Sequence, residues 1–93
     1  MKIKQVVGDN IRHIRIQNNL TLDDLSVMTK MSRTHLNAIE LARYGIGIEK
    51  LYLIAKALKV EPHVLLIANY YKTYQIKTPE APKKPRASST KSK

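Results

Sequence analysis

The stretch TLDDLSVMTKMSRTHLNAIELA, residues 21–42, decides the fold because it contains two helix starts with almost no chain between the two helices. Thr21 and Ser32 each precede a run of helix-forming residues, and a hydroxyl at that place accepts a hydrogen bond from the first helical turn. Two aspartates follow Thr21, where the helix dipole favours negative charge. Only residues 30–31 are left as a turn. The stretch therefore predicts two short helices joined by a tight turn.

The apolar residues of this stretch are three or four positions apart, the spacing that places side chains on one face of a helix. The polar residues that begin the second helix lie off that face, so they are expected to be exposed. The residues predicted to point inward are Leu22, Leu25, Met28, Leu36 and Ile39.

The chain on either side is also predicted to be helical, because the same apolar spacing continues and proline is absent until Pro62. We expect a first helix over about residues 6–18, a fourth that ends near Leu58, and a fifth that begins at Pro62 and runs toward Tyr71. These elements predict an all-α, five-helix fold. The further residues predicted to point inward are Val7, Ile11, Ile14, Ile48, Leu51, Ile54, Ala55 and Leu58.

The charge of the 93-residue chain is +10 and unevenly distributed. Residues 72–93 hold seven Lys and Arg against one acid, whereas residues 1–71 hold ten against six. The stretch from Thr78 onward contains three prolines and no large apolar residue. We therefore expect one domain over residues 1–74 and a flexible basic tail over residues 75–93. A positive balance favours polyanionic partners, nucleic acid first and anionic membranes second.

Several classes of protein are disfavoured by what the sequence lacks. There is no cysteine for disulfides or thiolate metal sites, and no apolar run approaches the roughly 18 residues of a membrane span. His13, His35 and His63 are isolated from one another, which argues against a metal site. No phosphate-binding loop, activated nucleophile or close acid pair is present, so we expect a cytoplasmic protein that is not an enzyme and that needs no cofactor or small-molecule ligand.

Two helices joined by a tight turn can place the second, a recognition helix, in the DNA major groove. Residues 21–42 resemble the helix-turn-helix of the lambda-repressor and Cro-like (XRE-type) regulators, and the resemblance extends from Val7 to Leu66. Gly8 with IRHIR resembles the opening of that family, and LYLIAKALKVEPHVLL is similar to its fourth and fifth helices. SRTHLNAIELARYGIGIEKLYLIAKAL looks closest to controller proteins of restriction-modification systems, with phage or plasmid repressors as the alternative.

The sequence departs from the family at three places. Lys30 replaces the usual glycine of the turn and is expected to adopt a left-handed conformation at a cost of roughly 1 kcal/mol. Leu22 replaces the usual glutamine at the start of the second helix, which removes a hydrogen bond to DNA that the family commonly makes. The usual Glu-x-Gly after the recognition helix is Glu40-Leu41-Ala42, and a glycine follows only at Gly45.

The resemblance implies DNA contacts from the recognition helix, about residues 32–41, and from its flanks. Arg33 can pair bidentately with guanine, and Asn37 can bind adenine or a phosphate. Thr21 and Ser32 are primarily caps. For Arg33, the alternative to base reading is a solvated arginine or one that clamps a phosphate. The remaining predicted base contacts are Thr34, His35 and Ala38, and the predicted phosphate contacts are Thr21, Lys30, Ser32, Arg43, Tyr44 and Lys50.

For Arg15 and Glu40 we expect a structural role and not a DNA contact, because the resemblance implies a buried ion pair between the first and third helices.

The expected function is that of a transcriptional regulator that binds a pseudo-palindromic operator as a homodimer, with half-sites about 34 Å apart. An antitoxin-like or adaptor domain that binds a protein partner is the main alternative. A membrane-surface role is disfavoured because the helices use their apolar faces for the core. The predicted dimer interface, which could instead partly cover the monomer core, comprises Tyr52, Leu66, Ile67, Tyr70 and Tyr71, with Tyr74 as a further candidate.

Overall fold

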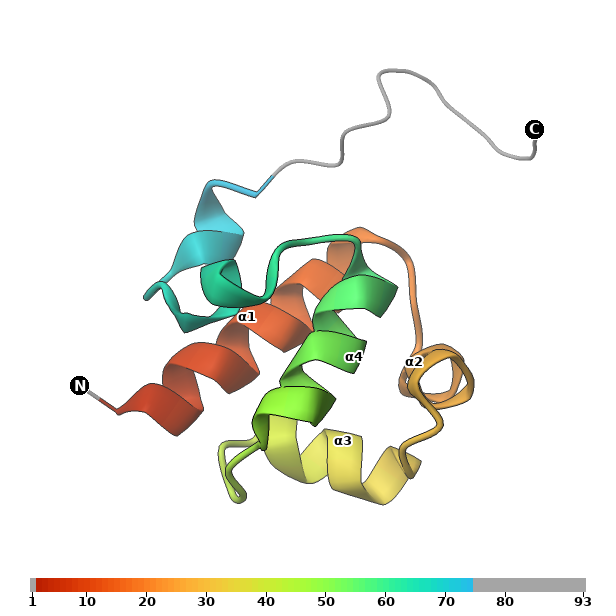
Figure 1. The fold of residues 1–93 in the computed structure, drawn as a ribbon. Coiled ribbons are helices and arrows are strands. Elements are labelled where there is room, and N and C mark those ends of the chain that lie inside the picture. The colour runs from red at the N-terminus through yellow and green to blue at the C-terminus, as the bar shows by residue number, and fades with distance from the viewer. Residues whose placement is uncertain (1, 75–93) are drawn as a thin grey trace, which may run out of the picture.

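The computed structural model describes residues 2–74, and within these residues the regular structure is entirely helical (Figure 1). The all-α prediction is confirmed, while the first helix starts earlier than expected, at Ile3. The predicted tail, residues 75–93, lies outside the described residues. The elements are the α-helices α1 (Ile3–Gln17), α2 (Leu22–Thr29), α3 (Arg33–Glu40) and α4 (Ile48–Leu58), followed by the 3-10 segments η1 (Pro62–Leu66) and η2 (Tyr70–Lys72).

The predicted fifth α-helix is wrong. Pro62 does begin a helical segment, but η1 is a 3-10 helix that ends at Leu66. Ile67 is extended, with φ −91° and ψ 121°, and Asn69 is left-handed, with φ 62°. These two conformations interrupt any continuous α-helix before η2 begins, so the last part of the described chain is two short turns laid on α1.

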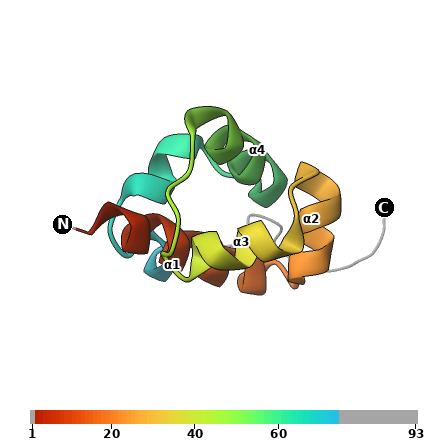
Figure 2. The same ribbon diagram turned by 90° about the horizontal axis from the view of Figure 1, so that it is seen from below.

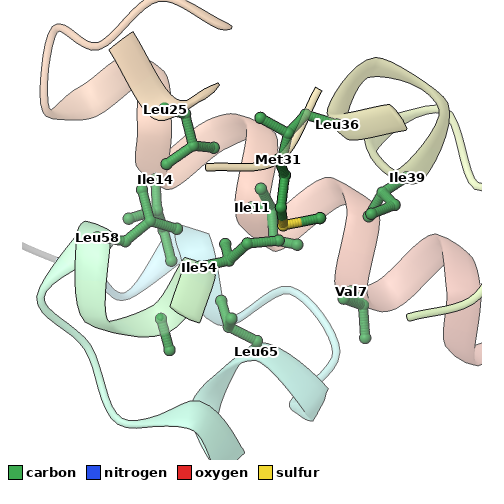
Figure 3. Packing of buried hydrophobic residues seen from close by; sticks show 11 residues of the cluster. Val7, Ile11, Ile14, Leu25, Met31, Leu36, Ile39, Ile54, Leu58 and Leu65 are labelled. Carbon is green, nitrogen blue, oxygen red and sulfur yellow. The ribbon is translucent and has the colours of Figure 1, made fainter. Parts of the chain in front are cut away.

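The core is built from one face of each α-helix and from η1 (Figure 3). The inward stripe of α1 is confirmed, since Val7, Ile11 and Ile14 are all buried. Two predictions of burial are wrong: Met28 is 49% exposed, and Ile48, at the first position of α4, is 86% exposed. The other large apolar side chains of the core are Leu25, Met31, Leu36, Ile39, Ile54, Leu58 and Leu65.

Thr29 explains the exposure of Met28, because it takes the neighbouring inward position on α2. Its hydroxyl donates to the carbonyl of Leu25 at 2.8 Å and accepts from the amide of Met31 at 3.3 Å. A buried hydroxyl with its hydrogen bonds made carries little penalty. The threonine therefore fits in the core and the longer methionine turns to solvent.

Asn10 is a fully buried polar residue that attaches the end of the described chain to α1. Its Nδ2 donates to the carbonyls of Leu65 and Ile67 at 3.0 and 2.8 Å, and its Oδ1 accepts from the amide of Tyr71 at 3.0 Å. Gln17 donates to the carbonyl of Tyr71 at 3.1 Å. Side chains of α1 thus supply the hydrogen bonds that the irregular backbone after η1 needs.

Candidate nucleic-acid interface

The start of α2 is fixed by a capping box at Thr21. Its Oγ1 accepts from the amide of Asp24 at 2.9 Å, and Oδ2 of Asp24 accepts from the amide of Thr21 at 2.9 Å. Ser32 caps α3 by accepting from the amide of His35 at 3.0 Å. Lys30, between the helices, is left-handed with φ 62°. Both predicted caps and the predicted conformation of Lys30 are confirmed, so the geometry of the turn follows from local residues.

α3 lies along the lower edge of the domain in Figure 1, with α2 beside it, and none of residues 2–74 forms an element beneath it (Figure 2). Arg33, Thr34 and Asn37 are exposed, and His35 is half-buried. Ala38 is different, because only 9% of its surface is exposed. Ala38 therefore packs mainly against its own chain and offers little surface for the predicted contact with a thymine methyl.

Asp23 interacts with the principal candidate for base reading. Nε of Arg33 lies 3.4 Å from Oδ1 of Asp23, and both side chains are largely exposed. An exposed pair of this kind contributes little to stability, but it links the first turn of α2 to the first turn of α3. From the sequence, Asp23 is expected only to interact with the helix dipole. The ion pair could have been predicted, because Asp23 and Arg33 lie in the first turns of two helices that a tight turn joins.

The flanks of α3 present the other candidate contacts. Ala42 has φ 62° and thus takes the left-handed conformation at the position of the family's glycine, and the amide of Arg43 donates to the carbonyl of Ala38 at 2.9 Å. The ring of Tyr44 meets His35 edge-on, with centroids 6.4 Å apart. The predicted phosphate contacts are all exposed: Thr21, Lys30, Ser32, Arg43, Tyr44 and Lys50.

The ion pair between Arg15 and Glu40 sets the position of α3 on α1. Nε and Nη2 of Arg15 lie 2.7 and 3.1 Å from the two carboxylate oxygens of Glu40, and Nη1 donates to the carbonyl of Leu20 at 2.8 Å. The side chains are 11% and 3% exposed. One guanidinium therefore joins α1, the end of α3 and the segment that leads into α2. Its role in this structure is to hold the elements together.

Comparison with known proteins agrees with this geometry. Residues 8–72 match the family described as "Helix-turn-helix domain". The chain belongs to the helix-turn-helix domain family. Over 75 residues it is 29% identical to "Control protein C.SmaI" of Serratia marcescens, an alignment that covers 81% of this chain and 89% of the relative. Its fold resembles that of a hypothetical transcription factor, NHTF, from Neisseria, with a TM-score of 0.70, 24% identity, and coverage of 76% of this chain and 82% of the other.

This helix-turn-helix protein also has an apolar surface beside α3. A pocket of about 320 Å³ lies between the start of α1, the loop after α3 and the start of α4. Ile48 and Leu66 are exposed at this pocket, and Tyr52 lies one turn after Ile48 on α4. The pocket is lined by Ile3, Lys4, Val7, Ile39, Tyr44, Gly45, Ile46, Ile48, Leu51 and Leu66.

The residues predicted to form a dimer interface divide into two groups. Tyr52, Leu66 and Ile67 are about half exposed and offer apolar surface to a partner. Tyr70, Tyr71 and Tyr74 are half-buried and pack against their own chain. The ring of Tyr71 stacks on His13 with centroids 4.0 Å apart, and the hydroxyl of Tyr74 accepts from Asn18 at 3.1 Å. These three tyrosines therefore cover part of the monomer core.

Other kinds of site are not seen in the described part of the chain. Residues 2–74 contain no group of three or more histidines and acids arranged to hold a metal ion. Within the same residues, no helix has both the length and the apolar character needed to cross a membrane.

Proposed function

We propose that this helix-turn-helix protein is a transcriptional regulator that recognises double-stranded DNA through α3. The observation that carries the proposal is the exposed polar edge of α3, where Arg33, Thr34 and Asn37 lie outside the core and beside the start of α2. Family membership and the similarity to a control protein support the same function.

Arg33 is the proposed reader of guanine, since its guanidinium can donate to O6 and N7 together. Asn37, one turn further along the same face, is the proposed reader of adenine, and Thr34 and His35 lie beside them. Arg43, Tyr44 and Lys50 follow α3 and are proposed to bind the phosphate backbone, together with Lys30 and the capped helix starts at Thr21 and Ser32.

A homodimer is part of the proposal, because one recognition helix reads only a few base pairs. A two-fold axis beside α3 would place the second helix in the next turn of the major groove, roughly 34 Å away. The apolar pocket, to which Ile39 of α3 contributes, is lined by the exposed Ile48 and Leu66 and supplies a surface for such contact. The exposed Tyr52, one helical turn after Ile48, and Ile67, next to Leu66, would extend this surface. The operator would then be a pseudo-palindrome.

The biological setting that we propose is control of a restriction-modification system, because the relative from Serratia marcescens is named a control protein. A phage or plasmid repressor would use the same geometry. Whether bound protein activates or represses depends on the position of the operator relative to the promoter.

The test is selection of bound sequences from a random duplex pool with the wild type and with Arg33→Ala. The wild type should return a palindrome containing guanine, and the variant should lose the guanine preference and bind the selected duplex about fivefold to a hundredfold more weakly. Lys56→Ala is the matched control, since Lys56 is an exposed cation in the last turn of α4, at the end away from α3. Sequence-independent binding by the wild type, or binding only to a protein partner, would overturn the proposal.

A further inference from the structure

Leu22 brings an apolar side chain to the base-reading side of the helix-turn-helix. A hollow of about 230 Å³ lies between the start of α2 and α3, and its lining residues are Leu22, Arg33, Thr34 and Asn37. Leu22 is half-buried: it packs partly on the core and also lines this hollow. The hollow therefore combines three polar side chains with one that can make only apolar contacts.

The major groove offers one apolar group on the edges of the bases, the C5 methyl of thymine. An A·T pair presents adenine N6 and N7 and this methyl in the same groove. Asn37 has the donor and acceptor that adenine requires, and Leu22 provides an apolar surface in the same hollow. One A·T pair can therefore engage both side chains.

We propose that Leu22 is a specificity-determining residue that recognises thymine by its methyl group, on an A·T pair whose adenine is bound by Asn37. The inference rests on the proposed function and names the second base pair that α3 would read. A shorter or more polar side chain at position 22 would remove less water from the methyl than leucine does and would therefore gain less from it.

Asp23 places the guanine contact next to this pair. It follows Leu22 directly, and its carboxylate lies 3.4 Å from Nε of Arg33, so the guanidinium stands at the edge of the same hollow. The half-site expected from this arrangement has its guanine beside the A·T pair.

The experiment uses the full chain and the duplex obtained by selection, in which each thymine of one half-site is replaced singly by deoxyuridine. This change removes only the methyl group and keeps base pairing intact. For the wild type, one such replacement should weaken binding about fourfold, the effect of losing one buried methyl-sized contact. For Leu22→Gln, the same replacement should leave the affinity unchanged.

Val27→Ala is the matched control, because Val27 is an apolar residue of α2 that is 79% exposed and does not line the hollow. It should keep the fourfold loss. Thermal unfolding checks that Leu22→Gln is folded, and Leu22→Ala, which also removes the contact, replaces it if the glutamine variant does not fold.

Two results would overturn the inference and leave the regulator in place: no thymine whose methyl matters to the wild type, or an equal loss in the wild type and in the Leu22 variant. A selection that returns no preferred sequence overturns the proposed function, and the inference with it.

Discussion

Gly8 allows α3 to lie directly on α1. A Cβ at this position would stand 2.6 Å from the carbonyl oxygen of Ile39 and 2.8 Å from that of Glu40. Both atoms are backbone, so neither can turn aside as a flexible side chain would. The close approach brings the end of α3 to the place where Arg15 reaches Glu40. The absence of a side chain at Gly8 thus determines how closely α3, the helix that is proposed to enter DNA, packs on α1.

We predict that Gly8→Ala lowers the free energy of unfolding by about 1–3 kcal/mol, the usual cost of overpacking. Alanine favours a helix over glycine by up to about 1 kcal/mol, which offsets only part of that cost. Chemical denaturation measures the change. Gly45→Ala is the control, because a Cβ there meets only the end of the Lys4 side chain, at 3.7 Å. Equal stability of the two variants would show that α1 and α3 can separate at no cost.

Residues whose conformation depends on near neighbours could be predicted from the sequence. Thr21 and Ser32 cap helices because their hydroxyls lie next to free amides. The left-handed conformation of Lys30 could be predicted in a different way, from the glycine that the resembling family has at this position of the turn. Ala38 is less exposed than the helical spacing predicts, because a helix of eight residues has a narrow exposed side and the packing of its neighbours decides where that side ends. The hollow at Leu22 depends on how α2 and α3 pack against each other. The spacing of apolar residues along a single helix does not predict that packing.

At the scale of elements, the fifth helix is the clearest failure of sequence reasoning. The stretch after Pro62 has helical spacing, yet two of its carbonyls, those of Leu65 and Ile67, accept hydrogen bonds from the buried amide of Asn10. These partners are more than fifty residues away in the sequence, at separations of 55 and 57. Tertiary contacts therefore override a local preference, whereas α1 to α4 keep the structure that their own residues favour.

Asn10→Asp tests that account. The change keeps the shape of the side chain but replaces its donor with a carboxylate oxygen that faces two carbonyls. We predict a loss of at least about 3 kcal/mol in the free energy of unfolding, because a buried carboxylate oxygen that faces two carbonyl oxygens costs more than a missing hydrogen bond. Hydrogen exchange should show lost protection of the backbone amide of Tyr71, which donates a hydrogen bond to Oδ1 of Asn10 in the wild type.

The control for that prediction is Gln5→Glu, the same chemical change at an exposed position in the first turns of α1. It should leave stability nearly unchanged, since a negative charge suits the start of a helix. Unchanged stability and unchanged exchange in Asn10→Asp would mean that the segment from η1 to η2 is held by its apolar contacts alone.

At the scale of the whole molecule, the proposed function depends on how the polar edge of α3 and the apolar pocket are arranged relative to each other. The polar edge of α3 and the apolar pocket adjoin one another through Tyr44, which contacts His35 on one side and lines the pocket on the other. Because the proposed dimer surface borders the proposed DNA surface, the two recognition helices of a symmetric dimer would be held at a fixed separation. Dimerisation and operator spacing are thus linked in this proposal.

Ile48→Asp separates dimerisation from folding. Ile48 is 86% exposed in the first turn of α4, where the helix dipole favours an acid, so the monomer should fold as before. If the apolar pocket and its surroundings form the dimer interface, burying a carboxylate there should weaken self-association roughly tenfold to a hundredfold, measured by sedimentation velocity without DNA. Val27→Asp alters an apolar side chain on α2 that is 79% exposed, and it should leave self-association unchanged. An Ile48→Asp protein that associates like the wild type would place the interface elsewhere, and the separation of the half-sites would then no longer follow from this flank of the domain.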